Sequence, residues 1–390
     1  MKKETLLFCI ILFLSIGCQQ RKVYTSNIES DSTTVDITVN LENYQGVPYD
    51  SLIDDISFVR LETNDDCLIG AISQIICTDS LMFISDRDVS KSIYCFDRQG
   101  KFLRKLGAVG QGLGEYSGYY CYITLSPDKK NLIIMDWGKL IYFDFKGNLL
   151  KEITLDSSHA IRNLEFIDNN LMAGFEFYGN TSVKSKPMLS VYDTQLNLEH
   201  CAFPTISTDN FVLSPMNPLR KFDNEVYFNL PYSDTFYKVS SNHVSKAFHI
   251  NFIKGGGAPP IEEGIDDRVY AEQLYKTIYC EDFIILKDVA VFQLSMPNGG
   301  YPIVAYSFKS KKTYYGNLNC HNPLFCLYKV PLTRDKENTL VTANSALSML
   351  KLKQRLYESK AVNEEVLSQL YDGLTEESNP TIFFFHVNVD

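Results

Sequence analysis

Aspartates recur at positions where they could bind a ligand, and one of them precedes Trp137. Asp86-Arg87 and Asp136-Trp137 each end the second apolar run of a repeated unit, and Asp234 is a candidate third copy. Carboxylates repeated around a funnel would bind a cation or sugar hydroxyls, and Trp137 would add a stacking platform. The alternative, which we favour, is that each aspartate caps its own turn, as aspartate commonly does.

A glycine-rich segment, residues 107–116, is the second candidate site. Its glycines would let backbone N–H groups approach an anion, but it lacks the Lys-Ser/Thr ending of a phosphate-binding loop, and no helix follows. If the segment crosses from one β unit to the next, Gln111, Glu115 and Tyr116 would line the mouth of a central channel. The alternative is a packed crossing whose glycines adopt unusual φ angles.

Linear catalytic motifs are missing from the sequence. It contains no Gly-x-Ser-x-Gly elbow, no His-Glu-x-x-His pair and no Asp-x-Asp-x-Asp-Gly calcium loop, and its six histidines are scattered. We therefore predict no metal and no cofactor, and leave the catalytic residues unknown. A site assembled from single residues of several units would carry no such motif, so a hydrolase or lyase stays the alternative to a binding protein.

Composition limits the class of protein. Of the 390 residues, 45% are hydrophobic and 22% are charged, which excludes a disordered or multi-span membrane protein. The net charge of -10 disfavours nucleic acid as a partner. The 24 Tyr and 25 Phe residues favour half-buried, pleated surfaces and so indicate β structure.

The N-terminus reads as an export signal. Lys2 and Lys3 precede an apolar run at 6–17, which is too short to span a bilayer and ends at Cys18. This pattern resembles a bacterial lipoprotein signal, which implies that residues 1–17 are removed and Cys18 is acylated. The alternatives are an ordinary cleaved signal and an uncleaved anchor. Residues 18–50 are polar, and we expect a flexible tether there.

Export also bears on the cysteines. Eight remain after Cys9 in the signal and Cys18 are set aside, and no short disulfide framework is visible among them, so we expect mostly buried thiols. A disulfide between Cys320 and Cys326 is the alternative for that pair.

A hairpin pattern recurs along the chain. Residues 94–103 are echoed at 142–150 and more weakly at 191–198, and their aspartates Asp97, Asp144 and Asp193 are 47 and 49 residues apart. Each copy is an aromatic strand, a polar turn and a second strand. Two further apolar runs precede each hairpin, which makes four strands per unit, the blade of a β-propeller.

Counting the copies predicts an all-β, six-bladed propeller over residues 51–390. Five blades lie between about 70 and 318, and the sixth combines residues 324–328, 339–342 and 381–385 with 56–61 from the N-terminal side. Such a closure by an N-terminal strand leaves no open edge in the last blade.

Residues 344–373 interrupt the β pattern with apolar residues at helical spacing. We expect two helices, with Asn344 and Asn363 as N-caps and Gly373 as the stop, inserted in the last blade. They would pack on the side or rim of the propeller; the alternative role is a helix pair that binds a partner.

Several segments together resemble a known family. Residues 58–63, 68–70, 96–102, 107–116 and 379–381 look like those of exported six-bladed β-propeller lipoproteins, relatives of NHL-repeat propellers. The resemblance spans about residues 52–390 and implies architecture and location more than chemistry. It implies a membrane-anchored, non-catalytic propeller of the bacterial cell envelope, expected at the outer membrane. Its partners would be a small molecule, glycan, peptide or envelope protein; a purely structural subunit is a third possibility.

Overall fold

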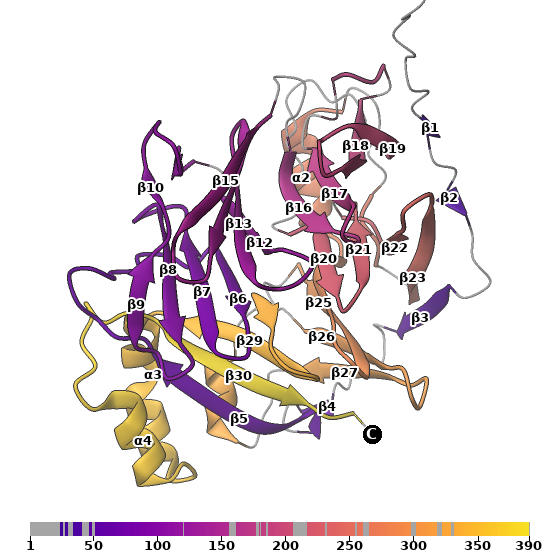
Figure 1. Cartoon of the computed structure of the whole chain (residues 1–390). Helices are drawn as coiled ribbons and strands as arrows, with labels where there is room; N and C mark the ends of the chain where they lie inside the picture. The colour runs from indigo at the N-terminus through magenta and orange to yellow at the C-terminus, as the bar shows by residue number, and fades with distance from the viewer. Residues whose placement is uncertain are drawn as a thin grey trace, which may run out of the picture.

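The chain forms six antiparallel β-sheets arranged in a ring, as the sequence predicted (Figure 1). The computed structural model describes residues 24–25, 28–29, 34–40, 47–48, 51–119, 121–155, 161–176, 179, 181–184, 186–205, 217–230, 232–253, 256–259, 265–297, 302–317, 322–328 and 331–389. The predicted lipidation site Cys18 and the candidate disulfide partner Cys320 lie outside these residues.

Each of the first five blades is a four-stranded meander numbered from the central channel outward. Blade 1 comprises β6 (Gln74–Cys77), β7 (Leu81–Asp86), β8 (Ser92–Asp97) and β9 (Phe102–Lys105). Blade 2 comprises β12 (Tyr122–Leu125), β13 (Asn131–Asp136), β14 (Lys139–Asp144) and β15 (Leu149–Thr154). Blade 3 comprises β16 (Ile161–Phe166), β17 (Leu171–Glu176), β18 (Pro187–Asp193) and β19 (Leu198–Pro204). Blade 4 comprises β20 (Leu219–Phe222), β21 (Glu225–Asn229), β22 (Thr235–Val239) and β23 (Val244–Ile253). Blade 5 comprises β24 (Tyr279–Ile285), β25 (Val289–Ser295), β26 (Ile303–Ser307) and β27 (Thr313–Asn317).

The two faces of the ring differ in their connections. One face carries the chain from each blade to the next, together with the turns between second and third strands; we call it the crossing face. The other carries the turns between first and second and between third and fourth strands; we call it the hairpin face. Sheet packs against sheet around the ring, so the middle strands are buried on both sides, and β13 is buried from Leu132 to Asp136. This is why the strands read as nearly continuous apolar runs.

The recurring aspartates build the outer hairpins. Asp97 Oδ1 accepts hydrogen bonds from the backbone N–H groups of Gln99 and Lys101, both at 2.9 Å. The same pair of bonds recurs at Asp144 and Asp193. The residue three positions after each aspartate has a positive φ: Gly100 (84°), Gly147 (90°) and Leu196 (67°). Leucine in this left-handed position explains why the third copy is the weakest echo in the sequence.

Blade 6 joins the two ends of the domain. It contains β28 (Thr333–Arg334), β29 (Thr339–Asn344), β30 (Thr381–Val387) and, outermost, β5 (Ile53–Arg60). β5 pairs antiparallel with β30, with Phe58 opposite Phe383. Asn379 locks the closure, because its Nδ2 donates to the carbonyls of Glu62 (2.6 Å) and Cys67 (2.7 Å) and its Oδ1 accepts from Ile69 N–H (2.8 Å).

The prediction of the first strand of blade 6 is wrong. Residues 324–328 were predicted to be its first strand, but they lie mainly in the 3₁₀ helix η2 (Pro323–Leu327). Proline at the start of η2 fits its first turn, and Asn322 caps it by accepting from Leu324 N–H. The innermost strand is instead the two-residue β28, which is too short to leave a period in the sequence.

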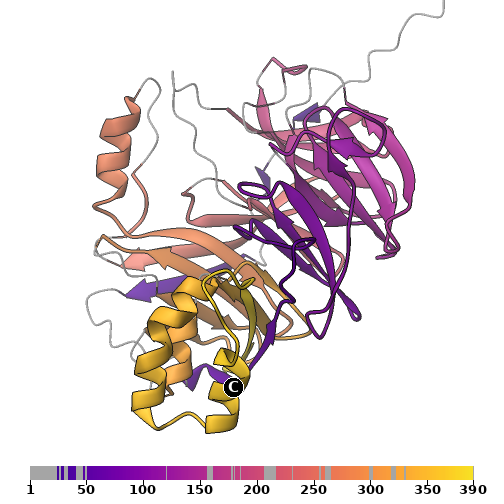
Figure 2. The ribbon, with the colours of Figure 1, turned by 90° about the vertical axis from the view of Figure 1, so that its left-hand side faces the viewer.

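The helical insertion is confirmed, with one cap corrected. α3 (Ala346–Ser359) and α4 (Glu364–Tyr371) lie beside β5 and β30 on the outside of the ring (Figure 2). Asn363 caps α4, but α3 is capped by Ser345 rather than Asn344. Asn344 is the last residue of β29, and its Nδ2 donates to the carbonyl of Leu327 at 2.6 Å.

A further helix, α2 (Asp267–Leu274), lies between blades 4 and 5. None of the helices in the described part of the chain is both long and apolar enough to cross a membrane. Five cysteines are buried, as expected: Cys67, Cys95, Cys121, Cys201 and Cys280.

The N-terminal segment corrects the expectation of a flexible tether. Its described parts are four strands, which we call the N-terminal strap: β1 (Tyr24–Thr25), β2 (Ile28–Glu29), β3 (Val35–Asn40) and β4 (Val47–Pro48). They pair parallel with the outermost strands of blades 3, 4 and 5 (Figure 1). Alternating apolar residues explain the pairing of β3, in which Ile37 and Val39 are fully buried. The strap covers sheet edges that would otherwise be open.

We predict that Ile37→Ala lowers the free energy of unfolding by about 2–4 kcal/mol, because it leaves a cavity under β3. Urea unfolding of the purified protein measures this. Thr38→Ala, an exposed neighbour on the same strand, is the matched control. Equal unfolding midpoints for the two variants would mean that the strap contributes nothing to the fold.

Candidate functional site

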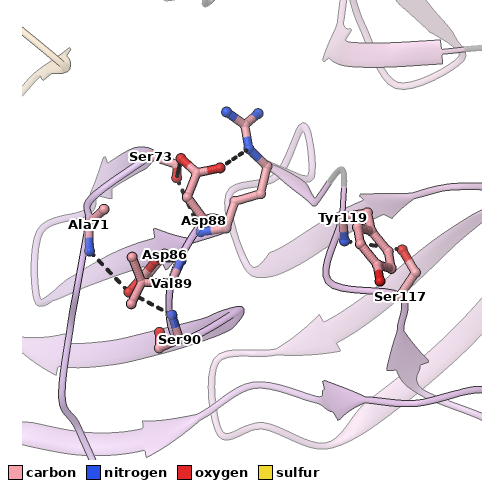
Figure 3. Close-up of polar contacts among 9 residues, drawn as sticks. Ala71, Ser73, Asp86, Asp88, Val89, Ser90, Ser117 and Tyr119 are labelled. Carbon is pink, nitrogen blue, oxygen red and sulfur yellow. Dashed lines mark hydrogen bonds and ion pairs between the residues drawn. The ribbon is translucent and has the colours of Figure 1, made fainter.

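Asp86 holds two loops of the crossing face together. It is fully buried, and its carboxylate accepts backbone N–H bonds from Gly70 (2.7 Å), Ala71 (3.2 Å), Val89 (2.9 Å) and Ser90 (3.1 Å). Figure 3 shows Ala71 and Ser90 directed at this carboxylate. Burial raises the pKa of Asp86, but these hydrogen bonds outweigh burial and the pKa lies below its ordinary value.

Asp136 has the same role in blade 2. Its carboxylate accepts from the backbone N–H of Ser117 (2.7 Å) and from the Ser117 hydroxyl (2.6 Å). A polar residue ends the second strand of every blade: Asp86, Asp136, Glu176, Asn229, Ser295 and Asn344. The hydrogen bonds of Asp86 and Asp136 are those of caps, and they leave these carboxylates facing their own loops.

Asp234 is not the third copy. The equivalent position in blade 4 is Asn229, the last residue of β21, whereas Asp234 lies directly before β22. Its Oδ1 is buried without a hydrogen-bond partner among the described residues. Burial raises the pKa of Asp234 to about 6, although His249 acts in the opposite direction.

The glycine-rich segment is a packed crossing, not the rim of the channel. β10 (Ala108–Val109) pairs with β11 (Glu115–Tyr116), and Glu115 accepts from Gly112 N–H at 2.7 Å. Gly114 N–H donates to Glu152 on the outermost strand of blade 2, so the segment lies on the outer part of the blade.

The side chains predicted to line the channel mouth are therefore elsewhere. Tyr116 is buried in the core between blades 1 and 2, where burial raises its pKa. Gln111 is exposed on the outer loop, and Glu115 closes that loop.

The remaining predicted residues also lie on the crossing face. Trp137 is 64% exposed in the turn between β13 and β14. Arg87 follows β7 and pairs with its neighbour Asp88 at 3.4 Å. Tyr119, which the sequence analysis did not single out, also lies on this face, and the Lys91 ammonium group is 4.3 Å from its ring centroid. These residues belong to separate turns, as Figure 3 shows for Asp86 and Tyr119, and nothing brings all the predicted residues to one point.

A cavity that the sequence did not reveal opens at the hairpin face of the channel. It has a volume of about 520 Å³ and is lined by turns and inner strands of blades 1, 2, 3, 4 and 6. A smaller cavity of about 100 Å³ shares Ile76, Glu165, Lys221, Thr333 and Arg334 with it and continues it inward. The larger volume lies within the range of small-molecule pockets. We call the two together the channel cavity.

Glu165 of blade 3 is the acidic group of this cavity. Its two carboxylate oxygens accept hydrogen bonds from the Tyr122 hydroxyl and the Thr124 hydroxyl of blade 2, each at 2.9 Å. Burial raises the pKa of Glu165, and the bonds from Thr124 and Tyr122 oppose the shift. Blades 2 and 3 are thus joined through a half-buried carboxyl group.

Basic side chains of blade 4 reach into the same space. Lys221 Nζ donates to the carbonyl of Phe166 at 2.6 Å, and burial lowers its pKa while Glu165 opposes the shift. The guanidinium group of Arg220 bonds to Asp282 of blade 5 (2.6 Å) and to the carbonyl of Leu332 beside blade 6 (3.0 Å). Arg220 therefore bridges the ring at the inner end of the cavity.

Arg334 of blade 6 is the last charged side chain of the channel cavity that we describe. Its guanidinium carbon lies 4.5 Å from the ring centroid of Phe222, a cation–π contact. Burial lowers the pKa of Arg334, and Asp223 and Asp335 oppose the shift. Sequence analysis missed these charges, which lie on the inner strands β16, β20 and β28. The available signal was a charged residue within the first apolar run of a blade. In the described ranges, no three His, Cys, Asp or Glu residues are placed to hold a metal ion.

The ring of six blades and its central cavity define a six-bladed β-propeller. The chain belongs to the family described as domain of unknown function DUF4934, whose profile matches residues 32–386. Curated proteins of known annotation include no match.

One solved structure shows the same fold, and two others are similar over part of the chain. The chain is similar to a protein of Bacteroides fragilis NCTC 9343 described as exported, with a TM-score of 0.76 and 18% identity over 92% of this chain and 100% of that one. A protein of unknown function from Bacteroides caccae has a TM-score of 0.39 and 12% identity over 63% of this chain and 81% of its own. An extracellular domain of a hybrid two-component system from B. thetaiotaomicron has a TM-score of 0.37 and 12% identity over 67% of this chain and 30% of its own.

Asp234 makes stability depend on pH. Its pKa rises from 3.8 to about 6 on folding, so the folded chain binds this proton more tightly than the unfolded chain does. The protonated carboxyl group therefore adds to the free energy of unfolding below about pH 4, and this contribution is lost as the pH rises through about 6. Asp234→Asn keeps the side chain neutral. We predict an unfolding temperature higher than wild type by about 2 °C at pH 7.5 and unchanged at pH 4.

The control for this prediction is Asp65→Asn, which alters an exposed aspartate of the same charge. Thermal unfolding of both variants at the two pH values measures the difference. A gain for Asp234→Asn at pH 4 equal to that at pH 7.5 would contradict the buried-carboxyl explanation.

Proposed function

We propose that this protein is a membrane-anchored, non-catalytic binding protein of the bacterial cell envelope, and that the channel cavity binds its ligand. The observation that carries this proposal is the convergence of Thr124, Glu165, Lys221 and Arg334 from four blades on one cavity of about 520 Å³. Propellers present side chains of several blades to a common axis, so a site needs no linear motif.

The envelope location is supported by the sequence. The apolar run at 6–17 ends at Cys18 as a lipoprotein signal does, and the B. fragilis protein of the same fold is described as exported. Acyl chains on Cys18 would hold the propeller at a membrane surface, because each buried CH₂ contributes about 0.8 kcal/mol. We propose that the protein is anchored in the outer membrane.

The non-catalytic assignment is supported by how the acidic group is used. Both oxygens of Glu165 are occupied by Tyr122 and Thr124, so the carboxyl group holds blades 2 and 3 together. One observation favours a hydrolase or lyase instead: burial raises the pKa of Glu165 and lowers that of Lys221, and such shifts are common at catalytic sites. Product formation from a bound ligand would decide for the enzyme.

A thermal-shift screen of small acids, glycans, peptides and divalent metals tests the location of the site. Thr333 lines both parts of the channel cavity, and we predict that Thr333→Phe blocks the ligand by filling the space. Trp137→Ala on the crossing face is the matched control and should leave binding unchanged. The reverse pattern would place the site on the crossing face and contradict the proposal.

We predict that Cys18→Ser moves the protein from the membrane fraction to the soluble fraction of its host cell, because it removes the acylated side chain. Fractionation followed by immunoblotting measures the distribution. Cys9→Ser, which lies inside the apolar run, is the control and should leave the protein with the membranes. Continued membrane retention of Cys18→Ser would exclude the lipid anchor.

A further inference from the structure

We propose that the channel cavity binds a small organic acid with a single carboxylate, which Arg334 and Lys221 hold. This inference rests on the proposed function, since it names the class of ligand for the same cavity. It follows from a count of the hydrogen-bond donors and acceptors that face the cavity.

Donors in the cavity exceed their partners. Arg334 carries five N–H donors, and the described residues offer its guanidinium the ring of Phe222 but no hydrogen bond or ion pair. Lys221 uses one of its three N–H donors on the carbonyl of Phe166. At the inner end, Arg220 Nε is buried without a hydrogen-bond partner. The buried Nε of Arg220 is costly to leave without an acceptor, and the half-buried Arg334 and Lys221 present further donors to the cavity.

The acids of the cavity are already engaged. Glu165 accepts from two hydroxyl groups, as described above. Asp335 is paired with Arg98, and Asp79 is paired with Lys336 at 3.1 Å. The remaining acid, Asp223, is exposed at the rim. Asp223 and Asp335 attract Arg334, but neither forms an ion pair with it, so we expect the ligand to supply the acceptor.

A carboxylate fits this set of donors. A guanidinium group presents parallel N–H donors whose spacing matches the two oxygens of a carboxylate, and an ammonium group supplies a further point charge. Asp79 and Asp223 at the rim and the net charge of -10 disfavour ligands with several negative charges. The ligand is thus expected to carry one negative charge.

The body of the ligand has an apolar wall to rest on. The outer part of the cavity is lined by Ile76, Leu125, Pro127 and Phe145, beside the charged groups. Apolar walls with a few polar groups that fix the orientation are typical of small-molecule sites. We therefore expect the carboxylate at the inner end and an aliphatic or aromatic body toward the hairpin face.

Fluorine NMR of the purified full-length protein tests this with two probes of equal shape. The first is 4-(trifluoromethyl)benzoate and the second is its neutral amide, 4-(trifluoromethyl)benzamide. We expect the benzoate to bind and the amide to bind at least about tenfold more weakly, because charged hydrogen bonds are lost. Inorganic phosphate should not compete with the benzoate.

Variants locate the binding. Arg334→Gln and Lys221→Met should each raise the Kd of the benzoate by about tenfold, whereas Lys336→Gln, which removes the same charge from the rim, should change it less than about twofold. The comparison of acid and amide on the wild-type protein stands even if one variant fails to fold. Equal binding of the two probes, no binding of the benzoate, or competition by phosphate overturns the inference.

This test separates the inference from the proposed function. If neutral ligands bind and Thr333→Phe blocks them, the channel cavity remains the binding site and only the inference that the ligand is an acid is overturned. Benzoate that binds but is insensitive to both Arg334→Gln and Thr333→Phe would remove the channel cavity as the site and overturn both.

Discussion

Closure of the ring by β5 and β30 is the interaction on which the rest of the structure depends. Both ends of the domain complete the last of the six sheets, through the antiparallel pairing of Ile53–Arg60 with Thr381–Val387. The side chain of Asn379 adds three hydrogen bonds to the segment that leads from β5 into blade 1. With the ring closed, the innermost strands of all six blades face one another, and short side chains cannot fill the axis. The charged groups of β16, β20 and β28 occupy it instead.

Those charged groups join the blades to one another, and they are the basis of the ligand site that we propose. Glu165 joins blades 2 and 3, and Arg220 joins blade 4 to blades 5 and 6. Each bond links strands that are distant in sequence, so each tightens the ring. Arg334 differs because its described surroundings give it an aromatic ring but no acceptor. In a protein with ten more acidic than basic residues, such a donor at the end of a cavity is best explained by a ligand.

Sequence reasoning recovered the architecture because blades repeat their turns. The aspartates of the outer hairpins have the same hydrogen-bonding role in blades 1, 2 and 3, and that role leaves a period in the sequence. The wrong predictions concern segments that do not follow the repeat of the blades. β28 has two residues, so the neighbouring apolar run in η2 was taken for the strand. β3 was read as a tether although its apolar residues alternate, because the strand it pairs with lies more than 200 residues away and the segments around it are polar.

The candidate site was harder to predict than the fold. Asp86 and Asp136 were found because they recur, but recurrence reflected the shared need to cap a loop. Residues of a channel come from several blades and differ between blades, so no spacing connects Glu165 with Arg334. Their proximity exists only after the ring has closed, and physical reasoning from the sequence had no means of placing them together.

The most direct test of the account is a crystal structure of the protein soaked with 4-bromobenzoate, with the bromine located by its anomalous scattering. The account predicts a bromine peak in the outer part of the cavity at the hairpin face, with the carboxylate density against Arg334. A peak confined to the crossing face, near Trp137, or no peak inside the channel would contradict it.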